Sequence, residues 1–215
     1  MSYDYWLKKW QENDIRFHLT RFHPALEKYA ENFLPGKILV PLCGKSLDMI
    51  YLASKGHFVI GVELSIIACR DFFSENGIKF NESSYGEFVL LESESITLWC
   101  GDFFKLPQHV WDEVSGIYDR AALVALTEDL RLLYAIEISS RIVKPVGVLL
   151  VAFEYPDNSI QGPPFSVSEK EISRIFTSFQ IKKLQAEKDS NFKDHPTLRS
   201  VVLTETVYWL LKDRS

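Results

Sequence analysis

Gly44, Glu63 and Asp102 have the residue types and the spacing of a nucleoside-binding site. Gly44 lies in the segment Val40-Pro-Leu-Cys-Gly-Lys-Ser46, and Glu63 follows it by 19 residues. An acidic side chain binds ribose hydroxyls at an offset of about 20 residues from such a loop. Asp102 could accept a hydrogen bond from an adenine amino group while Phe103 packs on the ring. Alternatively, Glu63 could be a strand-end charge or a helix cap, and Asp102 could belong to a common turn.

Two phosphate-binding motifs fail at this loop. Gly44-Lys-Ser46 resembles the end of a P-loop, but GxxxxGK[ST] requires glycine where Leu39 stands. The ten glycines are never closer than five residues apart, so the GxG of a dinucleotide fingerprint is absent. S-adenosylmethionine contains adenosine without a phosphate and needs only the tight turn at Gly44. The loop therefore favours this cofactor, and an NTPase remains an alternative of a different class.

Alternating strand-like and helix-like segments must position these residues. Apolar runs predict strands at 37–41, 57–62, 95–100, 114–118, 146–154, 179–187 and 201–211. Helical spacing predicts helices at 46–55, with Ser46 as its N-cap, at 65–75, at 127–142 and after the capping box 168–171. We therefore predict an α/β fold with a Rossmann-like, doubly wound, mostly parallel seven-stranded sheet that ends in an antiparallel hairpin.

Two further helices, 4–12 and 24–33, precede the first strand and belong to no βαβ unit. They predict a single domain, 1–215, with an N-terminal helical lid (1–35) and a Rossmann-like core (36–215). Trp6 and Trp10 lie four residues apart on one face of the first helix. Aromatic faces attract cations, so we expect this helix to cover a sulfonium cofactor, with Trp10 in contact. The alternative is that both tryptophans only bury the helix on the sheet.

Composition excludes several classes of protein. The chain has 215 residues with 24 Lys+Arg against 29 Asp+Glu, a net charge of −5, which argues against the broad basic face of a nucleic-acid partner. No apolar run approaches the ~20 residues of a membrane span. The three cysteines are odd in number and lack CxxC spacing, so we expect reduced thiols in a cytoplasmic protein without a bound metal. We also expect a monomer.

Several motifs resemble those of the thiopurine S-methyltransferases, bacterial type, a branch of the Rossmann-like S-adenosylmethionine-dependent methyltransferases. PLCGKSLDM (41–49) and YDRAALVAL (118–126) are the most distinctive. Shorter matches lie at 6–10, 17–18, 56–57, 61–65, 101–107 and 162–165. The match covers residues 6 to about 176 in the family's order and fades over the last forty residues.

The resemblance implies roles for individual residues. The family's cofactor contacts fall on Trp10, Leu42, Glu63 and Arg120, Asp102 and Phe103 line the adenine side, and its substrate-side aromatic falls on Phe17. Arg120 could contact the cofactor and steer an anionic acceptor, or it could pair with Asp119. Some members of the family place a basic residue near the substrate, and His195 and Arg199 are the candidates for it in this chain. The segment Gly162-Pro-Pro-Phe165 is expected to form a wall of the acceptor pocket.

The implied reaction is methyl transfer from S-adenosylmethionine to the sulfur of small aromatic or heterocyclic thiols, with S-adenosylhomocysteine as product. Selenium or tellurium species could also be acceptors. A thiol of low pKa arrives as thiolate, so no strong general base is required. Methylation of halide or thiocyanate remains an alternative, as does a non-catalytic Rossmann-like binding scaffold.

Overall fold

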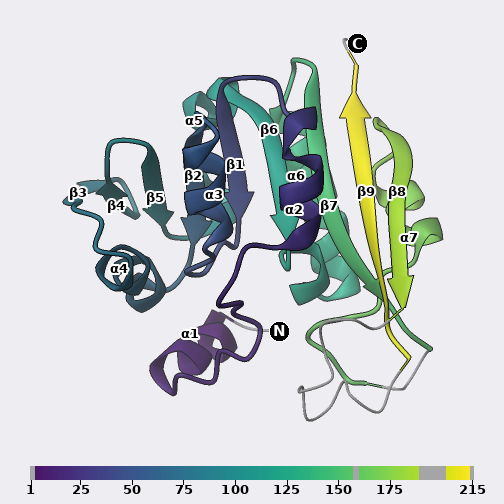
Figure 1. Ribbon diagram of the computed structural model, residues 1–215, viewed down its shortest axis with the longest axis horizontal. Helices are drawn as coiled ribbons and strands as arrows, with labels where there is room; N and C mark the ends of the chain where they lie inside the picture. Colours follow the sequence, from purple (N-terminus) through teal and green to yellow (C-terminus); the bar gives the residue numbers. More distant parts are fainter. Residues whose placement is uncertain (1–2, 157–159, 189–201, 214–215) are drawn as a thin grey trace. The chain divides into compact units, whose positions relative to one another are not determined.

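The computed structural model describes residues 3–156, 160–188 and 202–213 (Figure 1). The chain divides into two compact units, Met1–Tyr118 and Asp119–Ser215, and each is described by itself.

The strands of the first unit form a mixed sheet with a parallel centre. They are β1 (Lys37–Pro41), β2 (Phe58–Glu63), β3 (Asn81–Tyr85), β4 (Phe88–Glu92), β5 (Ile96–Cys100) and β6 (Val114–Arg120), whose last two residues belong to the second unit. Their order is β3-β4-β5-β2-β1-β6. β1 is parallel to both β2 and β6, and β2 is parallel to β5. β4 pairs with β3 and with β5 in antiparallel fashion.

Short helices precede these strands or connect them. They are α1 (Tyr3–Gln11), α2 (Pro24–Tyr29), η1 (Ala30–Asn32), α3 (Asp48–Ser54), α4 (Ile66–Glu75), η2 (Phe103–Lys105) and α5 (Gln108–Glu113). The central strands are buried along nearly their whole length, as expected of parallel strands covered on both faces. In Figure 1 the arrows of β1, β2 and β5 point to the side on which α1 lies.

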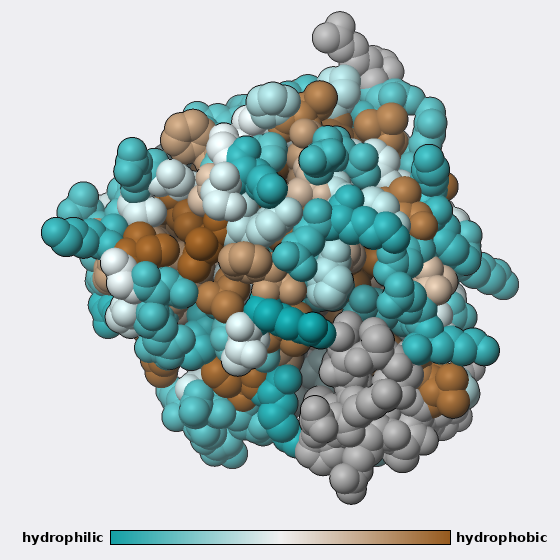
Figure 2. Space-filling view, in the orientation of Figure 1, coloured by the Kyte–Doolittle hydropathy of each residue, from teal (hydrophilic) through white to brown (hydrophobic). Residues whose placement is uncertain are grey.

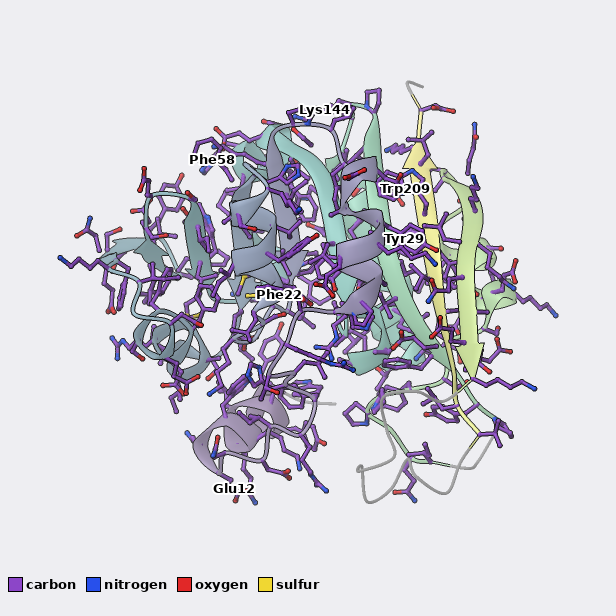
Figure 3. All side chains as sticks on the ribbon, viewed as in Figure 1. Glu12, Phe22, Tyr29, Phe58, Lys144 and Trp209 are labelled. Carbon is purple, nitrogen blue, oxygen red and sulfur yellow. The ribbon has the colours of Figure 1, made fainter. Side chains whose placement is uncertain are left out.

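The second unit contains η3 (Leu123–Ala125), α6 (Glu128–Arg141), β7 (Val146–Glu154), α7 (Glu169–Ile175), β8 (Gln180–Lys188) and β9 (Thr204–Lys212). β9 pairs in antiparallel fashion with both β7 and β8. Trp209 of β9 (Figure 3) lies over Gly147, where an added Cβ would come within 2.1 Å of the indole. The absence of a side chain at Gly147 therefore leaves room for this ring against the neighbouring strand.

The parallel centre and the antiparallel terminal strands confirm the predicted class, but the predicted number of seven strands is wrong. The described residues contain nine, because β3 and β4 form an unpredicted hairpin at the sheet edge. β3 reads Asn-Glu-Ser-Ser-Tyr and is exposed throughout, so it carries none of the apolar alternation that indicates a strand. The predicted N-cap Ser46 is also wrong, since α3 begins at Asp48 after Leu47.

Hydrophilic side chains cover most of the face seen in Figure 2, with smaller hydrophobic areas between them. Among the described residues, no helix combines the length and the apolar character that a membrane crossing requires.

Candidate active site

The carboxyl ends of β1, β2 and β5 lie next to one another because these strands are parallel. Glu63, at the end of β2, pairs with Cys100 at the end of β5. The segments that follow are bonded to the neighbouring strand: the Cys43 N–H donates to the Val62 carbonyl at 3.0 Å, and the Gly101 N–H donates to the Glu63 carbonyl at 2.8 Å. The loops after β1 and β5 therefore meet at the edge where doubly wound folds bind ligands.

Glu63 is the acidic side chain of this edge and is only 7% exposed. Its Oε2 accepts from the Gly44 N–H at 2.9 Å, and its Oε1 accepts from the Ser65 N–H at 2.8 Å. Burial raises the pKa of the carboxyl, and these backbone donors oppose that shift without cancelling it. The two oxygens of a carboxylate offer about four lone-pair sites, so this carboxylate keeps capacity to accept a hydrogen bond from a ribose hydroxyl.

The loop after β1 is a tight turn with two residues in the left-handed region. Leu42 has φ +47° and Gly44 has φ +53°. A side chain in this region costs roughly 1–2 kcal/mol, and such strain is concentrated at ligand-binding sites. Gly44 is required for a second reason, since an added Cβ would lie 2.9 Å from Cζ2 of Trp10.

α1 packs on this loop through its aromatic side chains. Trp10 is buried, with 6% of its surface exposed, and its ring meets that of Phe17 at 5.6 Å, edge to face. The Trp6 ring also packs edge to face with Phe17, at 5.7 Å between the ring centroids. The structure thus brings Trp10, Phe17, Leu42 and Glu63 to one place. The lid and the packing interpretations of the tryptophans are compatible, because Trp10 packs on Gly44 itself.

Asp102 and Phe103 lie in the loop after β5. The Asp102 carboxylate caps η2 by accepting from the Phe104 N–H at 3.0 Å. Burial and the neighbouring Asp102 carboxylate raise the pKa of Tyr3 to about 12. Asp102 therefore lies beside Tyr3 of α1, a proximity that the sequence did not indicate. The Phe103 ring is buried and packs edge to face on Trp111 at 5.5 Å.

Lys45 has no phosphate-binding geometry. It is 7% exposed, and its Nζ lies 2.7 Å from a Glu75 carboxylate oxygen and 3.9 Å from Asp71, both on α4. In a P-loop the equivalent lysine reaches toward the phosphates. This ion pair, together with Leu39, argues against the NTPase alternative.

Asp48 is a buried acid that the sequence reasoning did not single out. It is 2% exposed, and it accepts from the His23 N–H at 2.8 Å and from the Tyr118 hydroxyl at 2.9 Å. Phe22, beside His23, packs on Tyr51 of α3 at 5.2 Å (Figure 3). Asp48 lies in the motif 41–49 and Tyr118 in the motif 118–126. The presence of both distinctive motifs in one chain was the signal that could have pointed to the hydrogen bond between these two residues.

Arg120 belongs to the second unit and is the last residue of β6. The preceding residue, Asp119, is 1% exposed, and its Oδ1 accepts from the Ala122 and Leu123 N–H groups at 3.1 Å each. Its Oδ2 accepts from the Tyr134 hydroxyl at 2.7 Å. These bonds hold the turn after Arg120, in which Ala121 has φ +76°.

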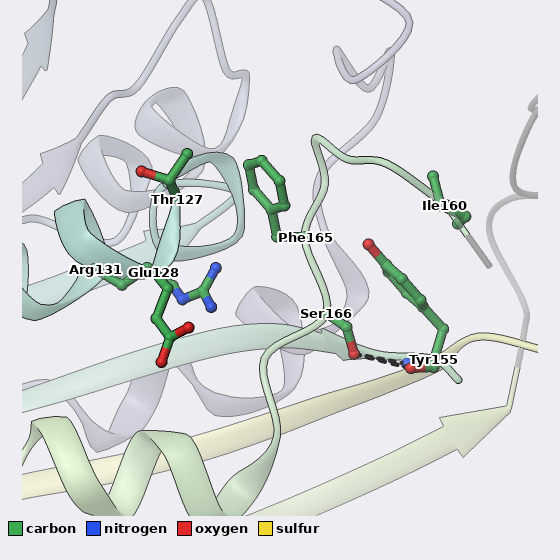
Figure 4. A pocket seen from close by; sticks show the side chains of 7 residues that line it. All are labelled: Thr127, Glu128, Arg131, Tyr155, Ile160, Phe165 and Ser166. Carbon is green, nitrogen blue, oxygen red and sulfur yellow. Dashed lines mark hydrogen bonds between the residues drawn. The ribbon is translucent and has the colours of Figure 1, made fainter. Parts of the chain in front are cut away.

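The second unit also contains an open cavity of about 310 Å³ (Figure 4), lined by Thr127, Glu128, Arg131, Tyr155, Ile160, Phe165 and Ser166. Phe165 is the only residue of the segment 162–165 that lines this cavity, and the role of that segment as a wall of the acceptor pocket stays a prediction. The Arg131 guanidinium lies 6.0 Å from the Phe165 ring centroid and donates to Glu171 at 2.6 Å. His195 and Arg199 lie outside the described residues.

Solved structures share this fold at low sequence identity. A SAM-dependent methyltransferase from Anabaena variabilis superposes with a TM-score of 0.68 at 15% identity, over 99% of this chain and 95% of that chain. A Burkholderia thailandensis 1,6-didemethyltoxoflavin-N1-methyltransferase, solved with S-adenosylhomocysteine, superposes with a TM-score of 0.66 at 15% identity, over 98% and 87%. The chain therefore has the fold of the S-adenosylmethionine-dependent methyltransferases, as predicted.

Sequence relatives define the family within that class. The thiopurine S-methyltransferase family model matches residues 1–214. A thiopurine S-methyltransferase of Shewanella oneidensis is 41% identical over the full length of both chains, and one of Pseudomonas putida is 40% identical over 85% of this chain and 86% of its own length. The chain belongs to the thiopurine S-methyltransferase family.

Proposed function

We propose that this chain transfers the methyl group of S-adenosylmethionine to the sulfur of small aromatic or heterocyclic thiols at the edge formed by β1, β2 and β5. Methyl transfer to thiols is the reaction of its family. The observation that carries the assignment of the site is Glu63, a buried carboxylate at the ribose position that also holds the turn at Gly44. Selenium or tellurium species are further candidate acceptors.

The residues at this edge fit the cofactor. Glu63 binds the ribose hydroxyls, Leu42 and the turn at Gly44 contact the remainder of the nucleoside, and Asp102 and Phe103 line the adenine side. Trp10 presents an aromatic ring beside the loop, and such a ring stabilises a cation by about 0.5–2 kcal/mol. The bound cofactor supplies an electrophilic methyl group on a positively charged sulfur.

The chain's residues act by positioning the reactants and by excluding water. Trp6, Trp10 and Phe17 form an apolar cover over the loop, and Phe17 is the proposed contact for an aromatic acceptor. Holding two reactants in line can contribute roughly 7–11 kcal/mol to the barrier reduction. A thiol of low pKa needs no proton removed in the transition state, so the proposal requires no general base.

We expect calorimetric titration to show binding of S-adenosylmethionine and none of ATP. Methyl transfer to thiophenol-type and thiopurine acceptors should then exceed transfer to iodide and thiocyanate, with selenite as a further acceptor to be tested. Binding of ATP alone would contradict the proposed cofactor. Faster turnover of iodide than of any thiol would favour the halide alternative, and cofactor binding without turnover would favour the scaffold.

Arg120 is proposed to contact the cofactor and to steer an anionic acceptor. Arg120→Ala is then expected to lower kcat/KM about tenfold for an aromatic thiol that carries a carboxylate, because one charge-assisted hydrogen bond contributes roughly 1.5–3 kcal/mol. A neutral aromatic thiol should be affected less. Arg120→Lys keeps the charge without the guanidinium fork and should restore only part of the loss. Unchanged kcat/KM for both thiols would eliminate this role.

We further propose that the chain acts as a cytoplasmic monomer. Its three cysteines, Cys43, Cys69 and Cys100, are free and buried, which is usual for proteins of a reducing compartment.

A further inference from the structure

Asp48 joins three separate segments of the first unit. Its Oδ1 accepts from the His23 N–H at 2.8 Å and its Oδ2 accepts from the Tyr118 hydroxyl at 2.9 Å, and these donors lie 25 and 70 residues away along the chain. Only 2% of the Asp48 surface is exposed, so the two hydrogen bonds compensate for the removal of the carboxylate from water. Asp48 has no role in the proposed transfer of the methyl group.

One of the joined segments carries the aromatic side chains that pack on the loop after β1. We call residues 3–23 the cover segment. Its Trp10 lies against Gly44, where an added Cβ would come within 2.9 Å of the indole. Its last residue, His23, donates its N–H to Asp48. The cover segment is therefore in contact with the loop at Trp10 and is hydrogen-bonded to Asp48 at its end.

Asp48 is itself fixed to this loop. It is the first residue of α3 and follows Gly44 by four residues, and its N–H donates to the Ser46 hydroxyl oxygen at 3.3 Å. Asp48 and the turn at Gly44 must therefore move together. The hydrogen bond to His23 thus ties the end of the cover segment to the same loop on which Trp10 packs.

We propose that Asp48 is a positioning residue, whose carboxylate holds the cover segment on the loop after β1 and thereby strengthens binding of S-adenosylmethionine through Trp10. Trp10 is the side chain that contacts the cofactor, and Asp48 acts on it through the chain that ends at His23. The effect on the cofactor rests on the proposed function, but the attachment of the cover segment to Asp48 does not.

The two hydrogen bonds of Asp48 allow the attachment to be separated from the burial of the acid. Tyr118 belongs to β6 and not to the cover segment, so Tyr118→Phe removes one bond from the carboxylate and leaves the bond to His23. Asp48→Ala removes both bonds. Asp48→Asn keeps an oxygen for the His23 N–H, and its amide can donate to the Tyr118 hydroxyl oxygen, which is also an acceptor.

A second pair of variants removes the donor instead of the acceptor. Proline has no N–H, and the His23 φ of −75° is one that proline adopts, so His23→Pro removes the hydrogen bond to Asp48 and leaves that to Tyr118. His23→Ala is its matched control. Both variants lose the imidazole, which accepts from the Ala25 N–H at 3.2 Å, but only proline loses the N–H. Asp48 is unchanged in this pair, so the comparison does not depend on whether Asp48→Ala folds.

Hydrogen exchange of the chain without ligand measures the attachment directly. The Asp14 and His18 N–H groups are hydrogen-bonded within the cover segment, at 2.9 and 2.8 Å, and report on its order. Asp48→Ala and His23→Pro should speed their exchange about tenfold, because local opening becomes easier once the bond between the cover segment and Asp48 is lost. The amides of β5 are the internal reference and should exchange as in the wild type.

Calorimetric titration with S-adenosylmethionine measures the consequence in a double-mutant cycle. Asp48→Ala and Trp10→Ala should each weaken binding about tenfold, and the double variant should bind no more weakly than Trp10→Ala, because the effect of Asp48 passes through Trp10. Independent effects would multiply to about a hundredfold. A loss of stability alone does not produce this coupling.

Three variants should keep both the exchange and the affinity within about twofold of the wild type. They are Asp48→Asn, which keeps the bond to His23, Tyr118→Phe, which keeps it as well, and Glu27→Ala, which removes an exposed carboxylate on α2. An Asp48→Asn variant as impaired as Asp48→Ala would overturn the role of the hydrogen bond.

The two measurements separate this proposal from the proposed function. Unchanged exchange of the cover segment in Asp48→Ala and His23→Pro would overturn the attachment. Faster exchange with wild-type affinity, or effects that multiply in the cycle, would overturn the action through Trp10. Faster exchange in variants of a chain whose wild type does not bind S-adenosylmethionine would support the attachment and contradict the proposed function.

Discussion

Glu63→Ala is expected to weaken binding of S-adenosylmethionine about a hundredfold and to lower the free energy of unfolding by about 2–4 kcal/mol. The substitution removes the proposed acceptor for the ribose hydroxyls. It also leaves the Gly44 and Ser65 N–H groups, both now bonded to this carboxylate, without a partner in a buried place. The turn at Gly44 and the start of α4 then lose the carboxylate to which both are hydrogen-bonded.

Calorimetric titration and urea unfolding separate these two effects. Glu63→Gln keeps one acceptor oxygen, so it should be more stable than Glu63→Ala and still bind the cofactor poorly. Glu92→Ala, at an exposed carboxylate at the end of β4, is the matched control and should change the unfolding free energy by no more than about 0.5 kcal/mol. Wild-type affinity in Glu63→Ala would rule out this site for the ribose.

Asp119→Ala is expected to be less stable than Asp119→Asn by about 3 kcal/mol or more at pH 7. Both variants are neutral at this position, so their difference isolates the hydrogen bonds. Asparagine keeps an oxygen for the Ala122 and Leu123 N–H groups, whereas alanine leaves these donors and the Tyr134 hydroxyl unsatisfied. Equal urea midpoints for the two variants would contradict this account of the turn.

Asp119 also makes stability depend on pH. Burial raises its pKa from 3.8 to about 6, so between these values the folded chain binds more protons at this site than the unfolded chain does. Stability from this group is therefore greatest below pH 3.8, falls as the pH rises toward 6, and is constant above it. The wild-type free energy of unfolding minus that of Asp119→Asn should fall by up to about 3 kcal/mol between pH 4 and pH 7. A flat or rising difference would show that the carboxyl titrates normally.

Several strands and helices could be predicted because their sequence patterns are local. β7 runs over 146–154 as predicted, since an apolar run of that length has few other folds. Ser65 caps α4, since its hydroxyl oxygen accepts a hydrogen bond from a backbone N–H at 3.3 Å. Ser168 caps α7 in the same way, at 3.2 Å. Strand β3 could not be predicted in this way, because a polar strand at an edge is stabilised by its neighbour rather than by burial.

The class of cofactor and the family could be predicted from the order of the residues alone, because glycine spacing, the missing P-loop glycine and the two long motifs need no three-dimensional information. The contacts of the site residues became known only from the folded structure. It assigned Glu63 to the Gly44 and Ser65 N–H groups, and Lys45 to Glu75 rather than to a phosphate. These partners come from separate strands and helices, and parallel pairing brings them to one edge regardless of their distance along the chain.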